Sequence, residues 1–207
     1  FISQMKVDGN DPAIDDPNKF IGKRYSAEDA EKMVSKYGWK LKEQEPGEWR
    51  RVVPSPTPLY IFNGRSIKHL VEFGTIVIAG GGGGIPAYNK PDGTLDGLDG
   101  VIDKDMTAAL LGRVLKAEEL FIVTDVDNIY INFNTPQQKP IYHASADEVI
   151  QWLENGEFGE GSMAPKIRAA IYFLKYHGQK VVITSLDKIE DAINDKAGTI
   201  ITNKGNE

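Results

Sequence analysis

The chain has 207 residues with a formal net charge of −6, and 41% of its residues are apolar. That length and apolar content suffice for one large domain, or for one domain with an insertion. The negative charge argues against broad, non-specific nucleic-acid binding, and the lack of cysteine excludes disulfides and thiolate metal sites. The three histidines are far apart, which argues against a histidine-based metal site, and no apolar run approaches the ~20 residues of a membrane span.

The amino-terminal part of the chain begins with Phe1 and with a segment typical of a strand end, which predicts a piece of a longer protein. Residues 26–38 then have the pattern of a helix, with Ser26 as the N-cap and a terminal glycine. Residues 39–53 predict a β-hairpin, because a Pro-Gly pair in their middle suits a type II turn. Residues 18–58 therefore form a small helix-and-hairpin unit, unlike the part that follows.

From residue 66 onward, short apolar runs alternate with helical patterns. The expected helices are 66–74, 103–117, 145–156, 165–178 and 186–194, and the expected strands are 75–79, 120–124, 180–184 and 198–202. Residues 131–142 indicate a hairpin or a loop. Continuous apolar strands that alternate with helices indicate a parallel sheet covered on both faces. Ligands of such sheets bind beyond the carboxyl ends of the strands, so the informative loops follow Ala79, Thr124 and Thr184.

The first of these loops is a run of five glycines: Gly80, Gly81, Gly82, Gly83 and Gly84. Together they destabilise the fold by about 3–5 kcal/mol relative to alanine, which a plain turn would not require. The run fits neither the P-loop spacing nor the dinucleotide fingerprint. Main-chain N–H groups without side chains favour an anion, phosphate first. The alternative is a flexible loop without a function.

Two lysines stand where a helix usually carries negative charge. Lys104 lies between Asp103 and Asp105 at one expected helix start, and Lys166 follows Pro165, expected as the first residue of another helix. A cation at a helix N-terminus is unfavourable by ~0.3–1 kcal/mol, so two of them suggest a shared anionic partner. The alternative is that both are solvated surface lysines.

The loop after the strand 120–124 supplies a carboxylate. Thr124 and Asp125 fall where that strand ends, and such a carboxylate can hold Mg²⁺ or a ribose hydroxyl. Val126 and Tyr130 can line an adenine pocket. The alternative is a plain turn built on the Asp and Asn side chains of residues 125–128.

These parts fit phosphoryl transfer, which needs a nest of N–H groups, cations on the phosphate oxygens and Mg²⁺ rather than a covalent catalyst. The chain offers no Ser-His-Asp set. Asp103 and Asp105 would splay apart at a helix start, which argues against hydrolysis by paired carboxylates.

Five segments, in this order, carry a resemblance to a known family: EWRRVVPSPTP, IVIAGGGGGIP, GVIDKDMTAALL, IVTDVDNIYINF and GEFGEGSMAPKIRAAIYF. They resemble the carbamate kinases, within the amino-acid kinase superfamily. The resemblance covers essentially the whole chain and matches the later part of the family's usual length.

The resemblance implies an α/β protein with the amino-acid kinase fold: a three-layer α/β/α sandwich with a mostly parallel sheet and a small protruding helix-and-hairpin subdomain. It divides the chain into residues 1–17, the end of an amino-terminal substrate-side portion, 18–58, the subdomain, and 59–207, the nucleotide-binding α/β portion. It implies reversible transfer of a phosphoryl group between carbamoyl phosphate and ADP, giving ATP and carbamate, with Mg²⁺. The setting it implies is arginine breakdown by the arginine deiminase pathway, in a cytoplasmic homodimer with neither nucleic-acid nor membrane partners.

The resemblance also assigns roles to residues. Lys104 and Lys166 would neutralise phosphate, Asp105 would organise Mg²⁺ and lysine, and Lys19 would reach in from the subdomain. Glycines 80–84 would hold phosphate oxygens or the carbamoyl end. The nucleotide side would comprise Thr124, Asp125, Val126, Tyr130, Met163, Ala164 and Pro165.

The chain departs from the family's pattern at Lys23-Arg24, where Pro-Phe is usual, and at Ala164, where glycine is usual. The family's amino-terminal segment carries a further glycine-rich phosphate loop, and a chain truly without it would be inactive. Two alternatives therefore stay open: another phosphotransferase of the superfamily, or a non-catalytic fragment for nucleotide binding or dimerisation. Arg50 and Arg51 suit either phosphate contacts or pairing with acidic neighbours.

Overall fold

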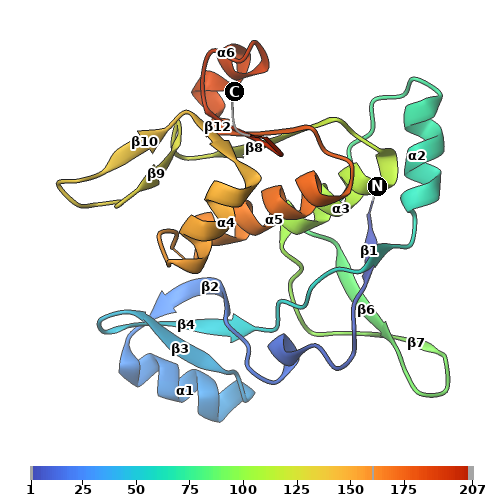
Figure 1. The fold of residues 1–207 in the computed structure, drawn as a ribbon. Helices are drawn as coiled ribbons and strands as arrows, with labels where there is room; N and C mark the ends of the chain where they lie inside the picture. Colours follow the sequence, from blue (N-terminus) through green and yellow to red (C-terminus); the bar gives the residue numbers. More distant parts are fainter. Residues whose placement is uncertain (1, 160, 205–207) are drawn as a thin grey trace. The chain divides into compact units, whose positions relative to one another are not determined.

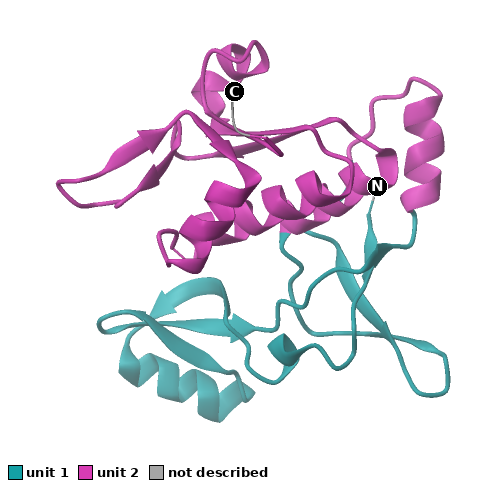
Figure 2. Ribbon diagram, in the orientation of Figure 1, with its two compact units in different colours: residues 1–63, 79–103 teal, residues 64–78, 104–207 magenta. Residues whose placement is uncertain are grey.

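The computed structural model describes residues 2–159 and 161–204, which divide into two compact units (Figures 1 and 2). Unit 1 comprises residues 1–63 and 79–103, and unit 2 comprises residues 64–78 and 104–207. Among the described residues, no helix is both long and apolar enough to cross a membrane.

Unit 1 contains a four-stranded sheet in the order β5-β1-β6-β7. Its strands are β1 (Gln4–Lys6), β5 (Tyr60–Ile61), β6 (Ile85–Asn89) and β7 (Leu95–Gly97). A short 3₁₀ helix, η1 (Pro12–Ile14), follows β1. β1 runs parallel to β6, and the other neighbours are antiparallel. The side chains of Met5 and Ile61, which are neighbours in this sheet, are buried in the core of unit 1.

The predicted helix and hairpin of unit 1 are both present. The elements are β2 (Lys19–Tyr25), α1 (Ala27–Tyr37), β3 (Leu41–Glu45) and β4 (Glu48–Val53), with the strands in the antiparallel order β2-β4-β3. Ser26 caps α1 by accepting a hydrogen bond from the Asp29 amide at 3.2 Å, and Gly38 ends it in the left-handed conformation. Gly47, in the turn between β3 and β4, has φ of +78°, which favours glycine there.

Unit 2 contains a second four-stranded sheet, in the order β11-β13-β12-β8, and a separate β9-β10 hairpin. Its strands are β8 (Glu119–Thr124), β9 (Ile129–Ile131), β10 (Lys139–Ile141), β11 (His143–Ser145), β12 (Lys180–Ser185) and β13 (Thr199–Thr202). Its helices are α2 (Gly64–Glu72), α3 (Lys104–Leu115), α4 (Ala146–Glu154), α5 (Met163–Tyr176), η2 (Leu186–Lys188) and α6 (Ile189–Ile193). The β9-β10 pair shows that residues 131–142 belong to a hairpin.

Both faces of the unit 2 sheet are covered, as the apolar strands predict. Val181 and Ile183 belong to one buried cluster with residues of α3 and α5, whereas Val182 packs with Ala192 of α6. Alternate residues of β12 thus face opposite layers, because successive side chains of a strand point to opposite sides. β12 runs parallel to β8 and antiparallel to β13.

The predicted strand 75–79 is wrong. These residues have no regular secondary structure, and none of the sheets formed by the described residues includes them. The side chains of Ile76 and Ile78 are 96% and 86% exposed. A strand needs a neighbour to complete its ladder of hydrogen bonds, so an apolar sequence alone does not make one.

Candidate functional site

The start of α3 places a carboxylate and an ammonium group side by side. Lys104 is its first residue and Asp105 its second, and the Asp105 residue is only 7% exposed. A carboxylate is favourable in the first turn because the helix N-terminus carries partial positive charge. Its neighbour Lys104 has a side chain that is 58% exposed.

The start of α5 brings a second lysine. The helix begins at Met163, so the prediction that Pro165 is its first residue is wrong by two positions. Proline is still tolerated there because the first-turn N–H groups have no partner within the helix. Ala164 is fully buried, and Lys166 follows Pro165 in the same turn.

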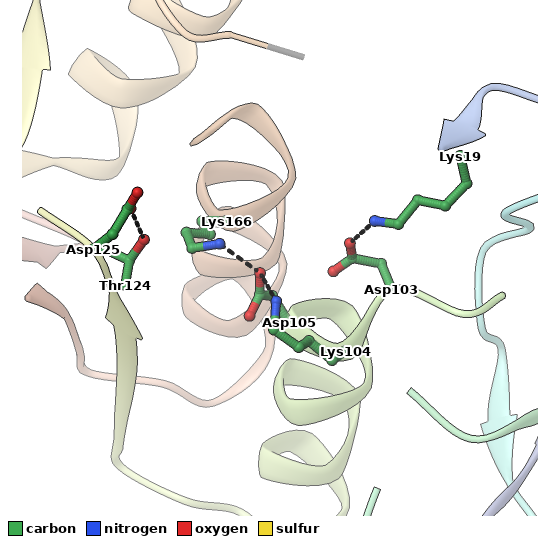
Figure 3. A network of polar contacts seen from close by, with 7 residues as sticks. All are labelled: Lys19, Asp103, Lys104, Asp105, Thr124, Asp125 and Lys166. Atoms are coloured by element: carbon green, nitrogen blue, oxygen red, sulfur yellow. Dashed lines mark hydrogen bonds and ion pairs between the residues drawn. The ribbon is translucent and has the colours of Figure 1, made fainter. Parts of the chain in front are cut away.

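A glycine allows α3 and α5 to approach closely. A Cβ atom at Gly112 of α3 would lie 2.6 Å from the ring atom Cε2 of Phe173 in α5, so a larger residue would require the Phe173 ring or one of the helices to shift. In this packing Lys166 Nζ lies 3.3 Å from Asp105 Oδ2, and Lys104 Nζ lies 3.4 Å from the same oxygen (Figure 3). The two lysines singled out in the sequence therefore meet at one carboxylate.

The electrostatics of this cluster favour an anion. The side chains of Lys166 and Asp105 are only 12% and 10% exposed, so each charge depends on the other because burial removes water. The three groups Lys104, Asp105 and Lys166 hold two positive charges and one negative charge, which leaves one positive charge in surplus. A phosphate oxygen can be stabilised by such a surplus.

The loop after β8 presents the predicted nucleotide residues. β8 ends at Thr124, whose hydroxyl donates to Asp125 Oδ1 at 3.0 Å (Figure 3). Asp125 is exposed, while Val126 and Tyr130 are half-buried. Asp127 accepts a hydrogen bond from Ser185, the last residue of the neighbouring strand β12. Residues 125–128 form a bend in which Asp125 is exposed to solvent.

In unit 1, Lys19 pairs with the other aspartate of the DKD segment. Lys19 is the first residue of β2, and its Nζ lies 2.8 Å from Asp103 Oδ2 (Figure 3). The side chains are 34% and 16% exposed. This ion pair is more accessible to water than that of Asp105 with Lys166.

The glycine loop of unit 1 divides into two halves. A Cβ atom at Gly83 would collide with the Ile102 carbonyl oxygen, and one at Gly84 would lie 2.6 Å from Met5 Cγ. Close packing therefore explains why glycine stands at these two positions. Gly81 and Gly82 are exposed, and a Cβ atom at either position would meet no other atom within 4 Å. Gly80 begins the turn, since its carbonyl accepts from the Gly83 amide at 2.9 Å.

Other residues of the site region were not identified from the sequence. Ser185 and Thr199 are buried and polar, and the only sequence signal was for Ser185, which follows the apolar run 180–184. The sequence allowed Arg50 and Arg51 either phosphate contacts or acidic neighbours. In the structure Arg51 lies 3.3 Å from Asp99, and Arg50 donates to the Gln44 side chain at 3.0 Å.

Comparison with known proteins gives one consistent set of matches. Residues 14–185 match the sequence profile of the amino acid kinase family. The carbamate kinase of Thermoplasma acidophilum is 44% identical over 200 residues, and that of Staphylococcus haemolyticus is 43% identical over 201 residues. Each match covers 97% of this chain and 65% of the relative, so the chain spans just under two thirds of their length.

Solved structures agree with the sequence matches. Carbamate kinase from Giardia lamblia bound to citric acid has a TM-score of 0.88 and 38% identity, over 98% of this chain and 63% of that chain. The same enzyme bound to AMP-PNP has a TM-score of 0.84 and 38% identity, over 98% and 64% of the two chains.

Proposed function

Because the chain belongs to the amino acid kinase family, we propose that it is the greater part of a carbamate kinase. The proposed reaction transfers a phosphoryl group reversibly between carbamoyl phosphate and ADP. The matches to carbamate kinases over nearly the whole chain support this choice within the family. The observation that carries the mechanism is the convergence of Lys104 and Lys166 on Asp105.

The cluster stabilises charge rather than forming a covalent intermediate. A terminal phosphate oxygen of ADP attacks phosphorus, the bond from phosphorus to the carbamoyl oxygen breaks, and carbamate leaves with that electron pair. Negative charge is spread over the three equatorial oxygens during transfer. Lys166 and Lys104 neutralise it, and Asp105 keeps both ammonium groups in place before the anion arrives.

The nucleotide side of the proposal rests on unit 2. Thr124, Asp125, Val126 and Tyr130 would bind the nucleotide from the loop after β8, and Met163, Ala164 and Pro165 from the first turn of α5. The Giardia lamblia relative was solved with AMP-PNP, which supports nucleotide binding by this chain.

Magnesium fits the donor set in an indirect way. The described residues contain no group of three or more His, Asp or Glu side chains able to hold a metal, whereas Mg²⁺ is commonly held by one or two carboxylates and substrate phosphates. Asp105 is the carboxylate available in the lysine cluster. When bound with the nucleotide, Mg²⁺ would be held with the help of Asp105 and would neutralise negative charge on the phosphates.

Unit 1 contributes the remaining parts of the proposal. The N–H groups of the glycine loop, chiefly Gly81 and Gly82, would hold phosphate oxygens or the carbamoyl end, and Lys19 would contact the transferred group from subdomain 18–58. The division into residues 1–17, 18–58 and 59–207, a cytoplasmic homodimer and a role in arginine breakdown belong to the same proposal.

The test measures ATP formation from ADP and carbamoyl phosphate with Mg²⁺, and a luciferase assay detects the ATP. It is run on this chain and on a chimera that adds the amino-terminal portion of the Thermoplasma acidophilum relative. We expect the chimera to make ATP. Phosphorylation of a carboxylate or a nucleotide acceptor instead would support another member of the superfamily. A chimera that binds ADP but transfers no phosphoryl group would support the non-catalytic alternative.

A further inference from the structure

Hydrogen bonds join the segment that follows β8 to buried polar side chains of β12 and β13. Of the seven polar or charged residues buried in the described part of the chain, four lie in the loop of residues 125–128 or in strands β12 and β13. They are Asn128, Thr184, Ser185 and Thr199. Buried polar groups are costly unless they are hydrogen-bonded, and Asn128, Ser185 and Thr199 make hydrogen bonds that involve residues 127–129.

One group of these bonds anchors the far end of the loop. Asn128 Nδ2 donates to the Ile141 carbonyl oxygen at 3.2 Å, and the Ile129 amide donates to Thr199 Oγ1 at 2.9 Å. The Thr199 hydroxyl in turn donates to the same Ile141 carbonyl. The loop therefore ends at a point tied to both β10 and β13.

A different bond holds the middle of the loop. Ser185 is the register partner of Thr124, so it stands beside the residue from which the loop departs. The Ser185 hydroxyl donates to Asp127 Oδ1. Ser185 is 8% exposed and belongs to a strand of the sheet, whereas Asp127 is exposed. Strand β12 therefore holds the loop through Asp127, the carboxylate that accepts the bond from Ser185.

We propose that Ser185 is a positioning residue for the nucleotide. Its bond to Asp127, together with the end of β8 at Thr124, leaves only Asp125 and Val126 between two held points. That segment is then kept in one conformation before the nucleotide binds, so binding does not have to order it. The inference rests on the proposed function, because it takes Asp125 and Val126 as part of the nucleotide site.

The mechanism predicts an effect on affinity and not on the chemical step. Asp127→Ala and Ser185→Ala should each weaken ADP binding about tenfold, as measured by isothermal titration calorimetry. The double variant should be no weaker than the single ones, since both remove one bond. Ser185→Thr keeps a hydroxyl and should restore most of the affinity. When Asp127→Ala or Ser185→Ala is introduced into the ATP-forming chimera, kcat at saturating ADP and the KM for carbamoyl phosphate should not change.

Ser145→Ala is a matched control, because it removes a serine hydroxyl that caps α4 and leaves the loop alone. It should lower stability but leave ADP affinity unchanged. If Ser185→Ala fails to fold, Asp127→Ala still tests the inference, because it removes the same hydrogen bond at an exposed residue. Parental affinity in Asp127→Ala, or a fall in kcat with affinity intact, would overturn the inference.

The two proposals fail differently. A parent protein that binds ADP but makes no ATP contradicts the proposed reaction, while the comparison of ADP affinities still decides the role of Ser185. A parent protein that binds no adenine nucleotide overturns both.

Discussion

Asp103 and Asp105 are two residues apart in the chain, yet their ion pairs differ. Asp105 and Lys166, which belong to unit 2, are nearly buried, with side chains 10% and 12% exposed. Asp103 and Lys19, which belong to unit 1, are 16% and 34% exposed. An ion pair in a less polar environment is stronger and less easily exchanged for water. We infer that the first pair holds its lysine fixed, whereas the second can release its lysine to a substrate.

The largest effect is expected at the buried lysine. Lys166→Met should lower kcat about 100-fold or more with little change in KM, because the ammonium group acts mainly in the transition state. Steady-state ATP formation by the chimera measures kcat and KM, and circular dichroism shows whether the fold persists. Lys175→Met, at an exposed position of the same helix, is the control. An unchanged kcat would remove Lys166 from the mechanism.

The next effect separates the two aspartates by stability. Asp105→Asn should lower the free energy of unfolding by about 2–3 kcal/mol, because it leaves the buried Lys166 without its counter-charge. Asp103→Asn should cost less than about 1 kcal/mol, as expected for a pair that water reaches. Urea denaturation measures both. Equal losses at the two positions would show that the two ion pairs contribute equally to stability.

The two ion pairs should also differ in how they depend on ionic strength. A double-mutant cycle of Lys19→Met with Asp103→Asn should show a coupling of about 0.5 kcal/mol at low salt that shrinks at about 0.5 M salt. The corresponding cycle of Lys166→Met with Asp105→Asn should change little, because salt screens buried charges poorly. A coupling of Lys19 with Asp103 that survives high salt would show that this pair, too, is held firmly.

The last prediction concerns Glu148, a carboxylate that accepts hydrogen bonds from a backbone amide and a hydroxyl, and it gives a reference for the two ion pairs. The backbone amide and then the hydroxyl of Ser145 donate to Glu148, and these bonds hold the pKa of Glu148 below its usual value of 4.5. Because the folded-state pKa is depressed, the charged form stabilises the fold above about pH 4.5, and this stabilisation is lost as pH falls through the folded-state pKa.

Ser145→Ala should therefore lower the free energy of unfolding by about 1 kcal/mol at neutral pH, and by less near pH 3. Urea denaturation at the two pH values measures the difference. A difference that grows in acid would mean that Glu148 is not the partner through which Ser145 stabilises α4.

Most of the fold could be predicted from the sequence. The amino-acid kinase fold class is confirmed by the family match over residues 14–185 and by a TM-score of 0.88 to a carbamate kinase structure. The helix at 26–38 and its Ser26 cap are also confirmed, because caps act over three or four residues. The start of α5 was misplaced because proline is allowed anywhere in a first turn.

The candidate site was predictable in its parts but not in its geometry. Lys104 and Lys166 stood out because each lies at a helix start, which depends on local sequence alone. That they share Asp105 depends on the close approach of α3 and α5, which Gly112 permits. Ser185 was missed because its partner, Asp127, lies 58 residues away in the chain.

Two similar apolar segments show where local sequence stops being decisive. LFIVT, residues 120–124, lies in strand β8 because β12 pairs with it, whereas TIVIA, residues 75–79, has no place in any sheet of the described residues. The amino-acid sequence by itself determined the helices, their caps and the turns, whose hydrogen bonds close within a few residues. The tertiary structure decided which apolar run became a strand and which charges met, because those contacts join residues far apart in the chain and form only when the chain packs.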